Sequence, residues 1–311
     1  MKLRWISDVL KEMYGEKIYR LALSSGCSCP NRDGTVGVGG CTFCSEGGSG
    51  EFAAEPAPVA EQIERAKTLV RAKTDGKRFI AYFQSFTNTY GDVERLRKLY
   101  TETILRDDIV ILSIGTRPDC LGDEVMEMLA ELNRIKPVWV ELGLQTANDA
   151  TAQRVNRGYP RSVFEDAYRR LREAGISVVV HLIFGLPGES REDMLASVSY
   201  IAGLTPPPDG VKLQLLQVLA GTKLAEEYRE CFAREDNASE DSRDNAPALH
   251  IMSLQEYGDL LVDALRLLPP ETVVHRITGD GPKRLLLAPK WCADKKKVLN
   301  YLTKRIREEL F

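Results

Sequence analysis

A glycine-rich loop near the start of the chain carries three cysteines at a spacing that suits a metal cluster. Cys29, Cys41 and Cys44 stand in the pattern C-x11-C-x2-C. Cysteine thiolates hold iron–sulfur clusters, and a [4Fe–4S] cube normally takes four of them. A cube with only three protein thiolates keeps one iron free for a ligand that is not protein. The spacing therefore indicates a cluster that could take part in catalysis as well as carry electrons.

A fourth cysteine in the same region leaves a second interpretation open. Together with the other three, Cys27 would complete a structural four-thiolate zinc site. The Cys27-Ser28-Cys29 pair is tighter than the usual zinc knuckle, however, which favours iron and sulfide. Phe43 directly precedes the last thiol and is suited to cover a cluster and to pack on a purine ring. The glycines of the loop would let the backbone wrap closely around an inorganic core.

Composition limits the class of protein. The chain has 311 residues, of which 43% are hydrophobic and 28% charged, enough for one large domain or a domain with an appendage. No apolar run is long enough to span a membrane. The first residues are charged throughout and lack the apolar core of a signal peptide. We therefore expect a cytoplasmic protein without membrane association, whose seven cysteines stay reduced.

Six apolar runs alternate with amphipathic stretches along most of the chain. The amphipathic stretches repeat apolar residues every three to four positions, as helices packed on a sheet do. Strand and helix in regular succession predict a parallel sheet with right-handed crossovers. The six expected strands are residues 18–23, 79–83, 109–114, 138–144, 176–184 and 211–218.

Polar residues at the carboxyl ends of these strands favour a barrel over a flat, doubly wound sheet. In (β/α) barrels the chemistry gathers at that end and is supplied by several strands at once. The fold predicted from the residues is an α/β, six-stranded partial (β/α) TIM-like barrel with a C-terminal α/β extension. The polar strand-end residues are Gln84, Ser85, Thr116, Arg117, Gln145 and Gln217.

Two ionisable residues interrupt otherwise apolar strands and are the candidates for catalysis. Strand alternation places Glu141 on the face of Trp139 and Gln145, and it places His181 on the face of Ser177. A carboxylate and an imidazole inside a barrel need partners or a ligand. A satisfied internal hydrogen-bond network and a catalytic role both remain open.

The regular alternation ends after Cys231. Residues 233–250 form an acidic, polar stretch without periodicity that we interpret as a linker or mobile loop. A helix is expected near 253–268, with Ser253 as its N-cap and Glu256 completing a capping box. Another strand follows at 272–278 and a basic helix at 294–310. From residue 275 onward there are ten Lys and Arg against four Asp and Glu. This basic end indicates either a nucleic-acid footprint or a solvated helix.

Several segments in order resemble the radical S-adenosylmethionine (SAM) enzymes, in particular the YhcC/YtqA-like branch that is related to the catalytic subunit of elongator. The segments are CPNRDGTVGVGGCTFC, YFQSFTNTY, GTRPDCL, VELGLQT, NRGY, HLIFGLPGE and HRITGDGPKRLLLAPKW. The resemblance implies a [4Fe–4S] cluster on Cys29, Cys41 and Cys44, with Cys27 as a spare thiol. It also implies SAM as second cofactor and a core barrel over residues 1–232, followed by the linker 233–250 and an extension over 251–311.

The resemblance also implies a set of cofactor contacts. Many such enzymes have Gly-Gly-Glu after the second strand, and this chain has Phe83-Gln84-Ser85 instead. Gln145 resembles a ribose-contacting glutamine and Arg157 a carboxylate-binding arginine of related enzymes. The residues expected at the cofactors are Phe43, Gln84, Ser85, Thr116, Gln145, Arg157, His181, Gly185 and Leu186.

The reaction and partners implied by the resemblance lie in tRNA modification. Relatives in this branch suggest conversion of carboxymethylaminomethyl-uridine to an aminomethyl-type uridine at the wobble position. The basic segment 275–311 would then contact tRNA, and a flavodoxin or ferredoxin would supply electrons. Radical chemistry on a small metabolite or peptide is the alternative within the same class. A zinc-stabilised RNA-binding module without catalysis is the alternative outside it.

Overall fold

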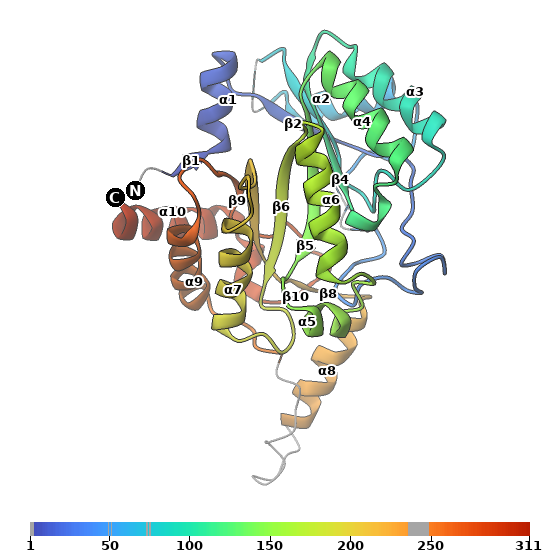
Figure 1. The fold of residues 1–311 in the computed structure, drawn as a ribbon. Helices are drawn as coiled ribbons and strands as arrows, with labels where there is room; N and C mark the ends of the chain where they lie inside the picture. Colours follow the sequence, from blue (N-terminus) through green and yellow to red (C-terminus); the bar gives the residue numbers. More distant parts are fainter. Residues whose placement is uncertain (1–2, 49, 51, 73, 75, 236–248) are drawn as a thin grey trace.

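A curled sheet of eight parallel strands forms the centre of the molecule. The computed structural model describes residues 3–311 except 49, 51, 73, 75 and 236–248. The strand order across the sheet is β1-β9-β7-β6-β5-β4-β3-β2, so the strands β2 to β7 lie side by side in the order of the chain (Figure 1). The strands of this sheet are β1 (Arg4–Trp5), β2 (Tyr19–Leu23), β3 (Phe79–Phe83), β4 (Ile109–Thr116), β5 (Val138–Gln145), β6 (Ser177–Phe184), β7 (Gly210–Leu215) and β9 (Val273–Arg276).

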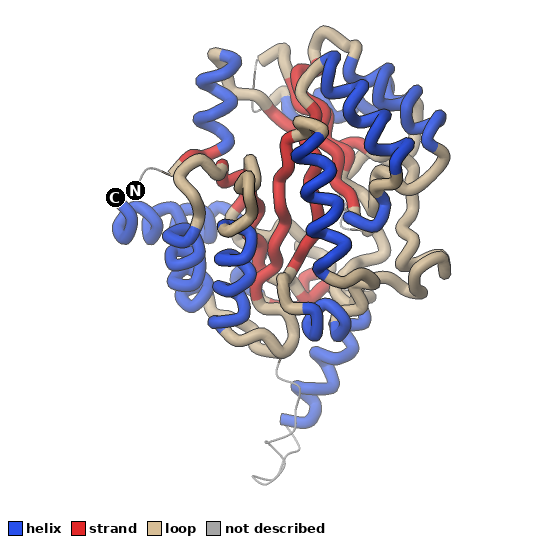
Figure 2. The backbone as a smooth tube through the Cα atoms, viewed as in Figure 1, coloured by secondary structure: helices blue, strands red, loops and turns tan. Residues whose placement is uncertain are grey.

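Helices cover the outer, convex face of the sheet, while the inner face surrounds the barrel interior (Figure 2). Most of them connect one parallel strand to the next, as right-handed crossovers require. The described α-helices are α1 (Ile6–Tyr14), α2 (Val59–Val70), α3 (Val93–Ile104), α4 (Asp123–Ile135), α5 (Asp149–Arg154), α6 (Arg161–Glu173), α7 (Arg191–Ala202), α8 (Lys223–Glu235), α9 (Leu254–Leu267) and α10 (Lys295–Leu310).

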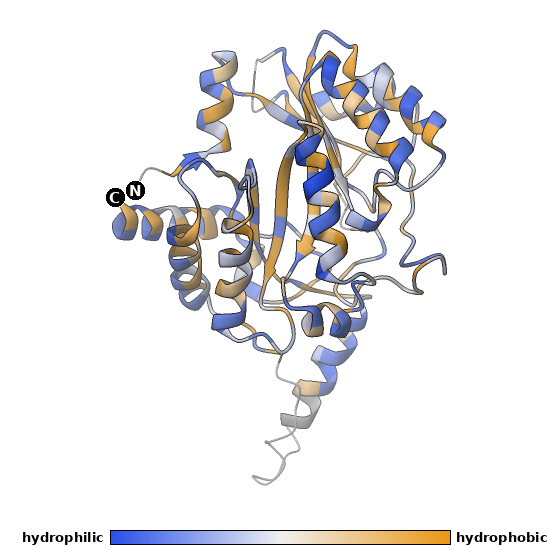
Figure 3. Ribbon diagram, in the orientation of Figure 1, coloured by the Kyte–Doolittle hydropathy of each residue, from blue (hydrophilic) through white to orange (hydrophobic). Residues whose placement is uncertain are grey.

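The main hydrophobic core lies between the sheet and these helices. Leu142 and Leu182, on neighbouring strands, are fully buried there together with Phe164 of α6. The strands are accordingly the most apolar part of the ribbon in Figure 3. Because side chains alternate along a strand, the residues between these apolar positions face the inside of the barrel.

Helix α1 closes the amino-terminal end of the barrel. Its Leu10 packs with Ile18, Ile80, Ile111 and Trp139 in a separate apolar cluster at the start of the strands. Residues farther along the strands are polar, so the barrel interior opens toward its carboxyl end. This is the end at which the sequence placed the site.

The barrel fold predicted from the sequence is confirmed, but the sheet has eight strands where six were expected. β9 pairs in parallel with β7, and β1 pairs in parallel with β9. The strand expected at 272–278 thus belongs to the main sheet. A two-residue strand such as β1 carries no periodic signal, and its position depends on a partner 269 residues away in the register Arg4↔Val273.

The run expected as one strand at 211–218 ends early. After β7 the chain turns and forms β8 (Val218–Leu219), which pairs antiparallel with β10 (Leu286–Ala288). This small ribbon lies at the carboxyl end of the barrel beside α5 (Figure 1).

The C-terminal helices follow the sequence closely. α9 begins after Ser253, whose side chain accepts from the Glu256 N–H in a complete capping box. α10 begins after Asp294 and packs along α9. Of the predicted linker, residues 233–235 form the last turn of α8, and 236–248 lie outside the described residues. In the part of the chain that the structure describes, no helix is both long and apolar enough to cross a membrane.

Candidate functional site

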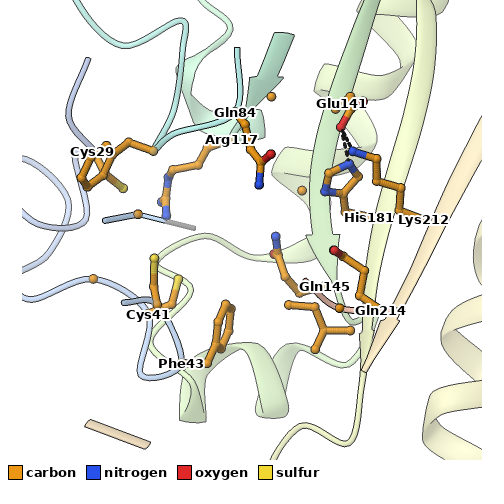
Figure 4. Close-up of a pocket in the computed structure, with 18 of the residues that line it drawn as sticks. Cys29, Cys41, Phe43, Gln84, Arg117, Glu141, Gln145, His181, Lys212 and Gln214 are labelled. Atoms are coloured by element: carbon orange, nitrogen blue, oxygen red, sulfur yellow. Dashed lines mark hydrogen bonds and ion pairs between the residues drawn. The ribbon is translucent and has the colours of Figure 1, made fainter. Parts of the chain in front are cut away.

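A deep pocket opens at the carboxyl end of the barrel and connects the cysteine loop to the barrel interior. Cys29, Cys41 and Cys44 line one end of it, and Glu141 and Lys212 line the other. Figure 4 shows the thiols on one side and the charged strand residues on the opposite side, with glutamine side chains between them. The loop that follows β2 and the inward positions of β3 to β7 therefore build a single site.

The cysteine loop is held in place by Val155 and Asn156. The Asn31 amide donates to the Asn156 carbonyl at 2.6 Å, and the Asn156 amide donates to the Gly40 carbonyl at 2.8 Å. The Thr42 N–H donates to the Val155 carbonyl at 3.0 Å. A Cβ at Gly37 would lie 2.3 Å from Asn31 Oδ1, so that glycine is required for the close approach.

The three thiols that line the pocket differ from Cys27 in their surroundings. Cys27 is buried in the main apolar core, and its sulfur accepts from the Arg95 guanidinium at 3.3 Å. It does not line the pocket. Burial raises the pKa of Cys29, and burial together with Cys44 raises the pKa of Cys41 to about 12. A bound cation would be needed to hold these thiols as thiolates. The ligand set of three stays a prediction, and all three of its members line the pocket.

Among the described residues, the thiols are not gathered as the ligands of a single metal ion would be. A single zinc ion bonds each sulfur at about 2.3 Å, which brings its ligands close together. Among the described residues, no three His, Cys, Asp or Glu side chains converge in that way. In a cube, by contrast, each thiolate binds a different iron and the sulfurs stay apart. The Asn31 amide lies 3.8 Å from Cys41 Sγ, and Asn31 Oδ1 is a buried acceptor without a partner.

Gln145 stands in a constrained position at the end of β5. Its backbone has φ 63°, a left-handed value, at an irregularity in the pairing of β5 with β6. The Tyr159 hydroxyl lies 3.1 Å from Gln145 Oε1 and donates to the Gly143 carbonyl at 2.8 Å. A Cβ at Gly143 would lie 2.5 Å from the Gln145 amide nitrogen. The glutamine is therefore aimed into the pocket by its backbone and by its neighbours (Figure 4).

Arg157 lines the pocket, but its N–H groups are directed to protein oxygens. The guanidinium is almost fully buried and donates to the carbonyls of Leu144 at 2.6 Å and Thr146 at 2.7 Å, and to Asp149 at 3.1 Å. It thus fixes the end of β5. The expected contact of Arg157 with a cofactor carboxylate stays a prediction.

Arg117, which the sequence identified only as a polar strand-end residue, lies nearer to the cysteine loop than its role in the sequence suggested (Figure 4). It stacks over the Tyr159 ring at 4.8 Å and donates to the Arg157 carbonyl at 2.9 Å. Its charge acts on the Cys29 thiol, and Figure 4 shows it between Cys29 and the pocket centre. Asp119 binds its other N–H groups.

The remaining expected cofactor residues divide into two groups. Phe43, Gln84, Thr116 and His181 line the pocket. Ser85, Gly185 and Leu186 are not among the lining residues, and Leu186 instead belongs to the apolar cluster against which Phe43 packs. The Gly185 N–H donates to Met194 Sδ at 3.0 Å, and a Cβ at Gly50 would lie 2.1 Å from the Ser85 hydroxyl. Their roles toward a cofactor stay predictions.

The barrel interior below the pocket centre holds a group of interacting polar side chains, which we call the inner polar cluster. Glu141 is at its centre. It binds the Lys212 ammonium, lies 2.9 Å from His181 Nε2, and accepts from the Ser113 hydroxyl at 3.0 Å. The Lys212 ammonium also donates to the Tyr82 hydroxyl at 3.0 Å. The members are Arg20, Tyr82, Ser113, Glu141, His181, Lys212, His275 and Arg276.

Electrostatics keep Glu141 ionised and the histidines neutral. Burial opposes ionisation of Glu141, but Lys212 and Arg20 hold its pKa well below the usual range. Burial and the charge of Lys212 lower the pKa of His181 to about 4. Burial and Arg20 hold the pKa of His275 well below its ordinary value. Burial holds the pKa of Lys212 well below its ordinary value, although the charge of Glu141 opposes that shift. The inner polar cluster therefore holds the Glu141–Lys212 pair together with the guanidinium groups of Arg20 and Arg276.

Both catalytic candidates from the sequence, Glu141 and His181, are thus partners in this network. The structure adds Tyr82, Lys212 and Arg276, which the sequence analysis missed. Lys212 had a detectable signal, because it interrupts an apolar strand in the same way as His181 does. The position of Arg276 depends on the parallel pairing of β9 with β7, which no local pattern indicates.

Two protein-family models and several relatives match this chain. Residues 29–201 match the description "Radical SAM superfamily", and residues 245–308 match "Radical_SAM C-terminal domain". "Uncharacterized protein YtqA" of Bacillus subtilis is 41% identical over 298 residues, which is 96% of this chain and 87% of the relative. A "tRNA uridine(34) acetyltransferase" of Dehalococcoides mccartyi is 36% identical over 121 residues, which is 38% of this chain and 26% of that protein.

One solved structure also shares the fold. The archaeal Methanocaldococcus infernus Elp3 with an N-terminal deletion superposes with a TM-score of 0.64 at 17% identity, covering 93% of this chain and 63% of that one.

Proposed function

The chain belongs to the radical SAM superfamily, and we propose that it is a tRNA-modifying enzyme acting on the wobble uridine. The specific reaction we propose converts carboxymethylaminomethyl-uridine to an aminomethyl-type uridine. Enzymes of this superfamily use a [4Fe–4S] cluster and SAM, which together supply a 5′-deoxyadenosyl radical that removes a hydrogen atom from substrate. Cys29, Cys41 and Cys44 would hold the cluster here.

The observation that carries the proposal is the basic surface beside the pocket mouth. Gly279, Asp280 and Gly281 line the pocket, and the Lys295 ammonium lies 2.6 Å from Asp280. This contact brings the start of α10 next to the mouth. Lys296 and Lys297 follow on the exposed part of the helix and have no ion pair with any described residue.

Exposed, unpaired lysines of this kind are suited to bind phosphates, which dominate the affinity of proteins for nucleic acid. An anticodon loop can splay a base away from its neighbours, and a base that undergoes chemistry must leave the stack. A pocket with phosphate-binding groups at its mouth and reactive groups inside would accept such a base. The partial similarity to the tRNA uridine(34) acetyltransferase supports the same class of substrate.

Two further parts of the proposal concern the electron donor and the cellular compartment. Radical SAM enzymes need an electron donor, and we propose a flavodoxin or ferredoxin for this one. A reducing, cytoplasmic compartment would suit the free thiols that line the pocket.

Mass spectrometry of tRNA nucleosides tests the proposal directly. Cells without the gene should accumulate carboxymethylaminomethyl-uridine and lose the aminomethyl form, and the intact gene should restore it. A gene carrying Cys41→Ala should not restore it. Identical nucleosides with and without the gene would overturn the proposal and favour a small metabolite or peptide as substrate.

Filter binding at varied salt tests the basic surface. The affinity for tRNA should fall as salt rises, and the joint substitution Lys296→Gln and Lys297→Gln should weaken binding and reduce the salt slope by about one per lost phosphate contact. Arg71→Gln, an exposed charge at the end of α2, is the matched control. Affinity that does not respond to salt would contradict the assignment.

A further inference from the structure

The pocket interior contains more positive than negative charge. Its two lining carboxylates are Glu141 and Asp280, and Asp280 is already paired with Lys295 at the mouth. In the inner polar cluster, Glu141 faces Lys212 and the guanidinium groups of Arg20 and Arg276. Lys212 is buried, whereas Arg20 and Arg276 are half-buried, so a ligand in the pocket can reach the guanidinium of Arg276. This excess of basic side chains favours an anion as the ligand.

Arg276 is the cation whose charge is not compensated. Its side chain lines the pocket and forms no hydrogen bond or ion pair with any residue that the structure describes. Lys212 is already bound to Glu141, and Arg20 lies 2.9 Å from His275 Nδ1 and 3.8 Å from Glu141. The guanidinium of Arg276 thus keeps its donors for a ligand.

Strand pairing brings the groups that would share this ligand together. His181 is the register partner of Lys212, and Lys212 is the register partner of Arg276. Paired residues of neighbouring parallel strands point to the same face, so the three side chains form a row across β6, β7 and β9 inside the barrel. An anion in front of this row would meet the Arg276 guanidinium, the Lys212 side-chain nitrogen that is paired with Glu141, and a neutral imidazole.

We propose that Arg276 and Lys212 form the subsite that binds the carboxylate of the substrate. The identity of that carboxylate, as part of a carboxymethylamino group on a nucleobase, rests on the proposed function. The guanidinium of arginine offers a planar fork that matches a carboxylate. The subsite would exclude the aminomethyl product, which lacks the carboxylate.

A carboxylate fits this position better than a phosphate does. The phosphates of an RNA lie on its backbone and would remain at the mouth, whereas only a base substituent would reach the far end of the pocket. The cysteine loop and the inner polar cluster lie at opposite ends of the pocket (Figure 4). A carboxylate held at the inner end would therefore place its neighbouring carbon between the two ends, where the hydrogen atom has to be removed.

Equilibrium binding without reductant tests the subsite independently of turnover. The probes are two anticodon stem–loop RNAs, one with carboxymethylaminomethyl-uridine and one with aminomethyl-uridine at the wobble position, and N-methylglycine as a small carboxylate competitor. The reconstituted wild-type protein should prefer the carboxylate RNA. Arg276→Gln should reduce this preference roughly tenfold to a hundredfold, the worth of one charged hydrogen bond or pair. Arg276→Lys should restore part of it, and the control Arg71→Gln should leave it unchanged.

The outcomes separate this inference from the proposed function. If the wild type binds both RNAs equally and N-methylglycine shows no Arg276-dependent binding, the subsite is overturned even if the tRNA nucleosides of deletion cells change. An equal loss of affinity for both RNAs in Arg276→Gln would also overturn it, because that result would mean that Arg276 supports the shape of the pocket in general. If N-methylglycine binds in an Arg276-dependent manner while neither RNA shows selectivity, the subsite stands and the proposed substrate fails. Stronger competition by inorganic phosphate than by N-methylglycine would overturn the assignment to a carboxylate.

Discussion

Substitution of Glu141 by glutamine is the sharpest test of the inner polar cluster. The side chain is fully buried and binds Lys212, His181 and Ser113. Glu141→Gln keeps the size and shape but removes the negative charge that compensates Lys212 and Arg20. Removing one partner of a buried ion pair costs about 3–5 kcal/mol, since the other charge stays buried without compensation. We expect a loss of that size in the free energy of unfolding.

A double-mutant cycle assigns the loss to the ion pair. Lys212→Met alone should also cost about 3–5 kcal/mol, because it leaves the carboxylate unpaired. The variant with both Glu141→Gln and Lys212→Met should be far more stable than the sum of the two losses predicts, with a coupling free energy of about 2–3 kcal/mol. Urea unfolding of the metal-free proteins, followed by circular dichroism, measures all four states without a contribution from cluster loss.

An exposed pair provides the matched control. Arg169 and Glu173 lie 2.8 Å apart on α6, with side chains 57% and 62% exposed. Glu173→Gln should therefore cost less than about 1 kcal/mol. The reasoning is refuted if Glu141→Gln costs no more than this control, or if the losses in the cycle simply add.

Three further predictions concern the thiols, the loop and pH. Cys27→Ala should keep the iron content after anaerobic reconstitution while Cys29→Ala loses it, because Cys29 lines the pocket and Cys27 does not; equal loss in both would contradict the ligand set. Asn156→Ala removes the 2.8 Å hydrogen bond to the Gly40 carbonyl and should speed iron loss to a chelator, with a change of about 1 kcal/mol in unfolding free energy; an unchanged rate would show that the contact does not hold the loop. The pKa of His181, about 4, lies below its unfolded value, so the folded state binds fewer protons and stability falls as pH drops from about 6.5 to 4. In urea unfolding across this pH range, His181→Gln should lose up to about 3 kcal/mol less stability than the wild type. If the stability of the variant and of the wild type fell in parallel with pH, a neutral buried histidine would be contradicted.

The sequence predicted the strands and helices of the barrel well, because a buried parallel strand is a continuous apolar run and its helix has a clear stripe. It did not predict how the sheet ends. β1 has two residues and no period, and β9 was recognised as a strand without its partner. The pairing of β9 with β7 depends on α9, which returns the chain to the sheet edge, and that is a tertiary property.

The same contrast holds for the site. Glu141 and His181 were found because an ionisable residue in an apolar strand is easily noticed. Their partners Lys212 and Arg20 also interrupt apolar strands, so the signal was present, but alternation alone cannot say which charges meet. Arg157 shows the opposite difficulty. A motif predicted a cofactor contact for it, which stays a prediction, and the motif gave no sign that its N–H groups bind the carbonyls at the end of β5.

The segment Asn156-Arg157-Gly158-Tyr159 explains why the parts of the pocket keep their relative positions. Asn156 holds the cysteine loop, Arg157 holds the end of β5, and the Tyr159 hydroxyl holds Gln145. Asn156 and Gly158 both have left-handed backbone, with φ 53° and 85°, so the chain reverses sharply and directs consecutive side chains to different neighbours. A Cβ at Gly158 would lie 2.9 Å from Asn31 Oδ1. Because these neighbouring residues together join the cysteine loop to the end of β5, we expect a change in one of them to shift the thiols relative to Gln145.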